Sequence, residues 1–175
     1  FYVNPGSWAT GGNLNTGRSS AAGAGTQTAA LVFGGEGPPF IAITESYNGT
    51  NWTEVADLNS ARAYLGGCGT NTAALAFGGN SAPQALTETW NGTNWTEVND
   101  LSTERKYLAG CGTNTAALAF GGSPPETAKT ELWNGTNWTE VNDLGTARQK
   151  LAGAGIQTAA LAFGGYNGSA NTITE

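Results

Sequence analysis

Four arginines recur at one position of a repeated sequence, and their type and spacing suggest anion chemistry. They are Arg18, Arg62, Arg105 and Arg148. A ring of guanidinium groups would hold an anion or a carboxylate ligand, because arginine donates paired hydrogen bonds to planar anions. The alternative is structural, with each arginine bonding backbone carbonyls or an acid of a neighbouring repeat, such as Asp57, Asp100 or Asp143. We expect the structural role.

Acidic pairs repeat in the same way and raise the question of a calcium site. The pairs are Glu54 with Asp57, Glu97 with Asp100, and Glu140 with Asp143. Calcium prefers clustered oxygen ligands, but these pairs lack the dense acids of a calcium loop, and we interpret them as a solvated face. The chain has no histidine, which excludes a Ser–His–Asp triad and a His-bearing metal site. We therefore expect no enzyme activity, no metal and no cofactor.

Asparagines that begin the pattern N-x-S/T are candidate glycosylation sites in a secretory host. They are Asn48, Asn51, Asn91, Asn94, Asn134, Asn137 and Asn167. Asn-Gly is also a strong hairpin signal. Because this dipeptide returns with every repeat, we interpret the sequons as turn chemistry.

Composition limits the partners and the use of cysteine. The chain carries a net charge of −6, from thirteen acids and seven bases, so we expect neither nucleic acid nor a membrane surface as a partner. No apolar run approaches the roughly 20 residues that span a bilayer. Cys68 and Cys111 occupy a position where other repeats have Ala24 and Ala154. We expect small buried residues there rather than a disulfide.

A sequence unit of about 43 residues is written nearly four times. Each unit has a Gly-Gly pair, at Gly34-Gly35, Gly78-Gly79, Gly121-Gly122 and Gly164-Gly165. A tryptophan keeps the same rhythm, at Trp8, Trp52, Trp95 and Trp138. Such a repeat is typical of stacked or radially arranged units that share one apolar core.

The third unit predicts four short antiparallel strands. Residues 108–112 are Gly-rich and apolar, 116–120 form a buried run that ends in Gly-Gly, and 130–133 and 138–141 flank Asn134-Gly135. Asn-Gly between two strands favours a type I′ turn. Because no segment keeps a helical period, we expect an all-β protein. The small Gly-Ala-Gly and Gly-Cys-Gly triplets suggest that the first strand of each unit lies at a crowded axis.

The order of these residues resembles the kelch repeat, in which a strand ending in Gly-Gly precedes an aromatic residue, a tryptophan and an arginine. The second copy has Gly78-Gly79, Trp90, Trp95 and Arg105. The resemblance covers essentially the whole chain and implies a β-propeller of four-stranded blades. The near-identity of the copies is also similar to the homogenised kelch-like arrays of phage tail-fibre and environmental-virus proteins. That similarity implies an extracellular or virion-surface location.

We predict one domain over residues 1–175, with repeats at about 15–58, 59–101, 102–144 and 145–175. Strand 1–14 would complete the last blade, because residues 1–3 share a repeat phase with Thr174 and Glu175. The N-terminal and C-terminal strands would then pair and close a four-bladed ring. Two alternatives keep the same phase: an eight-bladed ring of two chains, and a window on a longer array.

The copies differ most after Gly-Gly, and loops on a rigid scaffold commonly carry recognition. Candidate ligand-binding residues in these loops are Phe40, Ile41, Gln84, Glu126 and Tyr166. We predict a non-enzymatic binding or assembly module that recognises a protein or a glycan through these loops. The alternative is a purely structural repeat unit, such as a fibre segment, a symmetric scaffold or half of an eight-bladed homodimer.

Overall fold

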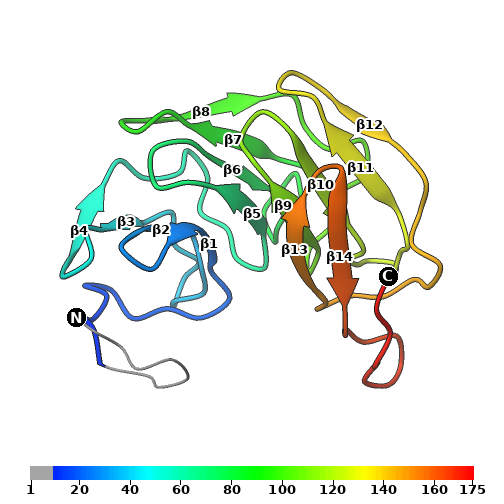
Figure 1. The fold of residues 1–175 in the computed structure, drawn as a ribbon. Helices are drawn as coiled ribbons and strands as arrows, with labels where there is room; N and C mark the ends of the chain where they lie inside the picture. The colour runs from blue at the N-terminus through cyan, green and yellow to red at the C-terminus, as the bar shows by residue number, and fades with distance from the viewer. Residues whose placement is uncertain (1–9) are drawn as a thin grey trace.

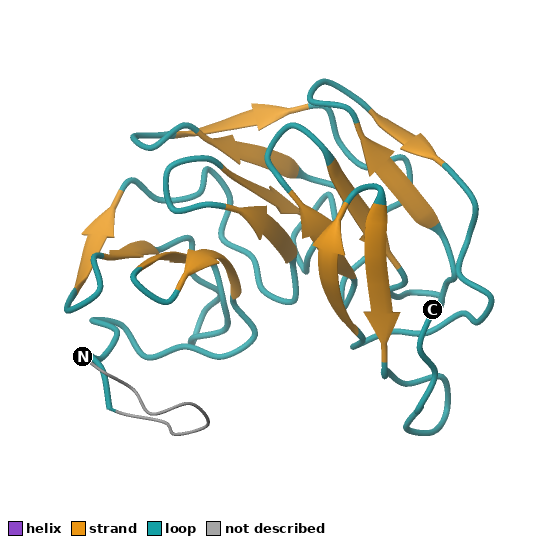
Figure 2. Ribbon diagram, viewed as in Figure 1, coloured by secondary structure: helices purple, strands orange, loops and turns teal. Residues whose placement is uncertain are grey.

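The computed structural model describes residues 10–175 and contains strands, turns and loops, with no helix in that range (Figure 2). Accordingly, no helix of the described range could cross a membrane. Trp8 and the strand predicted at residues 1–3 lie outside the described residues.

Within residues 10–175, fourteen strands form four antiparallel sheets in sequence order (Figure 1). Sheet 1 holds β1 (Ala22–Thr26), β2 (Ala29–Phe33), β3 (Thr44–Tyr47) and β4 (Trp52–Val55). Sheet 2 holds β5 (Gly66–Gly69), β6 (Ala74–Phe77), β7 (Thr87–Trp90) and β8 (Trp95–Val98). Sheet 3 holds β9 (Ala109–Gly112), β10 (Ala117–Phe120), β11 (Thr130–Trp133) and β12 (Trp138–Glu140). Sheet 4 holds β13 (Ala152–Ile156) and β14 (Ala159–Phe163).

Each of the first three sheets is a meander in which every strand pairs with the next along the chain. The predicted four-strand unit is therefore correct for these sheets. The hairpin type was wrong: four residues join β11 to β12, and only Gly135 has a positive φ, of 92°. The Asn134 side chain accepts hydrogen bonds from the backbone N–H groups of Thr136 and Asn137. This Asx turn replaces the type I′ turn, which needs positive φ at two residues.

The Gly-Gly pair after each second strand turns the chain where no side chain fits. Gly34 and Gly35 have φ of 65° and 121°. A β-carbon on Gly34 would lie 2.6 Å from the carbonyl oxygen of Arg62 in the next repeat. Gly35 N–H donates to that same carbonyl at 2.9 Å. Glycine is therefore required both by the backbone conformation and by the close approach of the next repeat.

The four sheets follow one another around an arc, with β1, β5, β9 and β13 as neighbours on its inner side (Figure 1). A phenylalanine from each of sheets 1 to 3 lies over a glycine of the next inner strand. A β-carbon on Gly67 would be 2.6 Å from the Phe33 ring, and one on Gly110 would be 2.4 Å from the Phe77 ring. The first glycine of the triplets in sheets 2 to 4 thus makes room for the preceding sheet's phenylalanine.

Tryptophans of the fourth strands join neighbouring sheets. The Trp95 ring meets Phe33 with centroids 4.8 Å apart and planes at 62°, and Trp138 meets Phe77 at 5.2 Å in the same way. Trp95 Nε1 donates to Thr44 Oγ1 at 3.0 Å. These contacts lie within the apolar clusters that form the core between sheets.

The fourth repeat and the ends of the arc differ from the prediction. Sheet 4 has two strands, and the backbone pairing of residues 173–175 with residues 162–164 begins a third. Within residues 10–175, no strand of sheet 4 pairs with sheet 1, and the two sheets lie at opposite ends of an open arc (Figure 1). The described part of the chain is therefore not a closed four-bladed ring. The pairing predicted to close it involves residues 1–3, which lie outside the described range.

Candidate recognition face

The four variable loops lie along one edge of the arc because each pairs with the segment that enters its own sheet. Single β-bridges join Ser19 to Glu36, Ala63 to Asn80, Lys106 to Ser123, and Gln149 to Tyr166. In every repeat the first residue after Gly-Gly is thus held beside the residue that follows the conserved repeat arginine. We call this edge the loop face.

A backbone ladder links the repeats along the loop face. Tyr64 N–H donates to the Ser20 carbonyl at 2.9 Å, Tyr107 N–H to the Tyr64 carbonyl at 2.9 Å, and Lys150 N–H to the Tyr107 carbonyl at 2.8 Å. All four residues have φ between 55° and 59°. Non-glycine residues rarely adopt this left-handed conformation, and such residues concentrate at functional sites.

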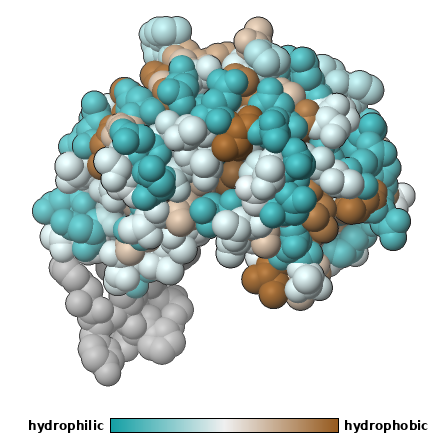
Figure 3. Space-filling view, turned by 90° about the horizontal axis from the view of Figure 1, so that it is seen from above, coloured by the Kyte–Doolittle hydropathy of each residue, from teal (hydrophilic) through white to brown (hydrophobic). Residues whose placement is uncertain are grey.

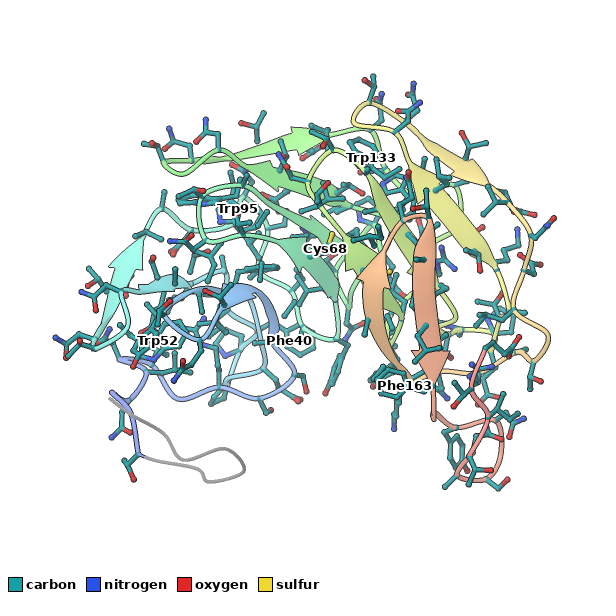
Figure 4. The ribbon with its side chains drawn as sticks, viewed as in Figure 1. Phe40, Trp52, Cys68, Trp95, Trp133 and Phe163 are labelled. Atoms are coloured by element: carbon teal, nitrogen blue, oxygen red, sulfur yellow. The ribbon has the colours of Figure 1, made fainter. Side chains whose placement is uncertain are left out.

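Three aromatic residues form a row on the loop face. The Tyr64 and Tyr107 ring centroids are 4.5 Å apart, and Phe40 meets Tyr64 edge-on at 6.3 Å. All three side chains are partly exposed, and Phe40 lies at the inner side of sheet 1 in Figure 4. We call Phe40, Tyr64 and Tyr107 the aromatic row. It presents apolar ring surface in a polar setting, as many ligand sites do.

Charged groups surround the aromatic row. The ammonium groups of Lys106 and Lys150 lie 5.4 and 5.1 Å from the centre of the Tyr107 ring, which places both within cation–π range. Tyr64 Oη donates a 2.6 Å hydrogen bond to Glu36. That hydrogen bond raises the pKa of the Tyr64 phenol, because it favours the protonated form.

The other predicted loop residues take different places. Ile41 is partly buried, and its carbonyl accepts a hydrogen bond from the Arg62 backbone, while the Gln84 carbonyl does the same for Arg105. Glu126 accepts a hydrogen bond from Gln149 Nε2 at 2.9 Å.

Tyr166 is 43% exposed, and no aromatic contact is found for it in the described structure. Of the predicted aromatic residues, only Phe40 therefore belongs to the aromatic row.

Tyr64, Tyr107, Lys106 and Lys150 were missed from the sequence, whereas Glu36 lies in one of the predicted variable loops. A signal was present, because the position two residues after the repeat arginine varies from Ser20 through Tyr64 and Tyr107 to Lys150. These residues precede the first strand of a repeat, whereas the loops after Gly-Gly follow the second strand, so the two segments are separated in the sequence.

The repeat arginines are held inside the sheets. Arg62 is fully buried and donates from Nη1 to the carbonyls of Gly78 at 3.0 Å and Leu86 at 2.5 Å. Its Nη2 lies 3.1 Å from Glu88 Oε1, and both side chains are buried. Burial lowers the pKa of Arg62 and the Glu88 charge opposes that shift. These contacts occupy the groups that an anionic ligand would need.

The acid partner of each arginine is a glutamate, which corrects the expected aspartates; it lies on the third strand in sheets 1 to 3 and at the equivalent position, Glu175, in the fourth repeat. Arg18, Arg105 and Arg148 pair with Glu45, Glu131 and Glu175. The aspartates instead accept backbone N–H groups, as when Asp57 accepts from Thr44 at 3.0 Å. The charge of Asp100 still acts on Arg62, but the hydrogen bond to the guanidinium comes from Glu88.

The two cysteines and the potential metal ligands can also be examined in the structure. Cys68 and Cys111 are free and buried, and burial raises the pKa of the Cys68 thiol to about 12, so it stays protonated at neutral pH. Across residues 10–175, no group of three or more potential metal ligands occurs.

No protein-family model matches the sequence, and a search of curated proteins finds no match either. The fold and the loop face therefore define the class of protein: an all-β repeat protein whose antiparallel sheets share one edge of variable loops.

Proposed function

We propose that this chain is an arc of a kelch-like β-propeller and acts as a non-enzymatic recognition module. The propeller arrangement is supported by the meander of each four-stranded sheet and by the row of inner strands along the arc. The location we propose is an extracellular or virion surface, where a uniform frame with variable loops serves recognition or a tail-fibre-like assembly.

The aromatic row carries this proposal. Tyr64 and Tyr107 are held in a left-handed backbone conformation by hydrogen bonds that join successive repeats. Their rings therefore start from a rigid frame, and little conformational entropy is lost when a ligand covers them. Aromatic rings beside lysine and glutamate groups suit a glycan or a protein segment with both apolar and polar groups.

Binding to a glycan array and to a panel of surface proteins tests the proposal. The informative variants are Phe40→Ala and Tyr64→Asn, because asparagine tolerates the left-handed conformation at position 64. Tyr166→Ala is the matched control, since it removes an exposed aromatic of the same face outside the row. We expect at least a tenfold loss of affinity in the first two variants.

Unchanged binding in both row variants, or an equal loss in Tyr166→Ala, would contradict a site on the aromatic row. A chain that binds nothing in either panel favours the alternative function, a structural repeat unit. The uncovered apolar side of sheet 4 is the observation that favours this alternative.

A further inference from the structure

Sheet 4 carries an apolar surface that nothing in residues 10–175 covers. Ile156 is 58% exposed, Leu161 46% and Phe163 38%. At the equivalent positions of sheet 2, Leu75 and Phe77 are fully buried. In Figure 3 the larger hydrophobic areas lie toward the half of the molecule that carries sheets 3 and 4. Contiguous exposed apolar side chains on a soluble protein mark an interaction surface.

The sequence of sheet 4 reinforces this surface. Ile156 ends β13, and the equivalent residues of the earlier repeats are Thr26, Thr70 and Thr113. Only the sheet with the open face has an apolar residue there. We therefore take the surface to be a docking site rather than a by-product of an incomplete sheet.

Within the chain, the next sheet covers the equivalent surface. Phe33 of sheet 1 lies over Gly67 and against the Trp95 ring of sheet 2, and Trp95 Nε1 donates to Thr44. The same three contacts join sheet 2 to sheet 3. Each of these two junctions thus has an inserting side, with phenylalanine and threonine, and a receiving side, with glycine and tryptophan.

Within residues 10–175, sheet 1 presents a receiving side with nothing inserted. A β-carbon on Gly23 would meet only the Leu31 carbonyl oxygen, at 3.3 Å, whereas at Gly67 the Phe33 ring comes within 2.6 Å. Trp52 is half-buried, and no ring from another described sheet lies on it. The inserting surface of sheet 4 and the receiving surface of sheet 1 are therefore complementary, and no described residue covers either of them.

We propose that Phe163 of one copy inserts between Gly23 and Trp52 of a second copy of this chain. The two surfaces lie at opposite ends of the arc (Figure 1), so a second copy brings them together. Phe163 in Figure 4 marks the inserting end. The contact is head-to-tail, and such contacts generate rings when the rotation closes and filaments when it does not.

The backbone supports the same pairing. Gly35 and Gly79 donate their N–H groups to the carbonyls of Arg62 and Arg105 in the next sheet, at 2.9 and 3.0 Å. Gly165 makes no such bond within the described residues. In the proposed contact it donates to Arg18 of the second copy. This inference rests on sheet packing and does not depend on the ligand proposed for the loop face.

Sedimentation equilibrium of the 175-residue chain from about 1 μM to about 1 mM tests the contact. We expect the mass to rise above the 17.8 kDa of one chain as concentration increases. Phe163→Asp removes the inserting side and Gly23→Val fills the receiving groove, so each variant alone should stay a monomer. Tyr166→Ser is the matched control and should associate like the parent chain. Circular dichroism checks that all variants fold.

Mixing the two monomeric variants separates this contact from other modes of association. The Gly23→Val chain keeps Phe163, and the Phe163→Asp chain keeps the receiving groove, so an equimolar mixture should form a dimer that stops at two chains. A symmetric dimer through sheet 4 alone could not recover in this way.

Three results would overturn the proposal: a parent chain that is a monomer at every concentration, association that survives both substitutions, or no dimer on mixing. A parent chain that is always a monomer would favour a different partner for the apolar surface of sheet 4, namely a further repeat of a longer chain.

Discussion

Sheets 2 and 4 share an identical segment and place it in different environments. Residues 73–79 and 159–165 both read Ala-Ala-Leu-Ala-Phe-Gly-Gly. In sheet 2 the phenylalanine is fully buried between Gly110 and Trp138, but in sheet 4 Phe163 is 38% exposed. The difference teaches that these residues form a strand whether or not the phenylalanine side is covered, whereas their contribution to stability depends on the neighbouring sheet.

The largest expected difference between the two sheets is the loss of unfolding free energy when each phenylalanine is replaced by alanine. Phe77→Ala should lower the free energy of unfolding by about 3–5 kcal/mol, because a buried ring is replaced by a cavity. Phe163→Ala should cost less than about 1 kcal/mol in the monomer, because its ring is already partly solvated. Urea denaturation at low protein concentration measures both. Equal losses would mean that sheet 4 is covered in solution even in the monomer.

The buried ion pairs should differ in the same direction. Arg62→Ala leaves Glu88 charged and buried, and we expect a loss of about 3–5 kcal/mol. Arg148→Ala should cost less, because its partner Glu175 is 28% exposed and can be solvated. The double variant Arg62→Met/Glu88→Leu is the control, and denaturation should show that it recovers part of the loss. A single and a double variant of equal stability would indicate that Arg62 acts through its carbonyl contacts alone.

The tryptophan–threonine hydrogen bond offers a smaller test. Thr44→Val deprives the buried Trp95 Nε1 of its acceptor and should cost about 1–3 kcal/mol. Thr174→Val changes the equivalent exposed residue of sheet 4 and should stay within about 0.5 kcal/mol of the parent. Thermal or urea unfolding of the monomer compares the two. If Thr44→Val leaves stability unchanged, as Thr174→Val should, the hydrogen bond between Trp95 and Thr44 does not stabilise the junction.

The smallest expected effect concerns acid stability. Burial alone would raise the pKa of Glu45, but hydrogen bonds from Asn15 and Thr16 and the charge of Arg18 outweigh it and hold that pKa below its usual value of 4.5. The hydrogen bond from Arg148 likewise lowers the pKa of Glu175.

A carboxylate whose folded pKa is lowered adds stability above its unfolded pKa and loses it as the pH falls through the folded value. Glu45→Gln and Glu175→Gln should therefore each flatten the fall in stability below pH 4.5. Added salt should weaken the Glu175 contribution and leave that of the buried Glu45 largely intact. Denaturation curves at pH 7 and in acid, with and without salt, measure this, and an identical salt response in both variants would contradict it.

Much of the frame could be predicted from the sequence, because local patterns carry it. The apolar run before Gly-Gly, the Asn-Gly hairpin and the repeat period predicted the strands of sheets 1 to 3. The partners of the buried side chains were harder to predict. The pairing of Arg62 with Glu88 joins the segment before β5 to strand β7, and Asp100 is a carboxylate equally plausible by spacing.

The aromatic row could not be predicted for a related reason. Phe40 lies in the loop of the first repeat and Tyr64 at the start of the second, and the β-bridges and the backbone ladder bring them together. Nothing in the spacing of these residues encodes the left-handed conformation at Tyr64 and Tyr107. The site is therefore a product of how repeats stack.

The sequence by itself determined the all-β class, the length of the repeat and the strands of each unit, because alternation, glycine and turn chemistry act over a few residues. Only the tertiary structure decided which face of each sheet is buried, that the arc is open across residues 10–175, and that Phe40, Tyr64 and Tyr107 lie together. These properties depend on contacts between residues tens of positions apart, and identical segments acquire different roles once their neighbours differ.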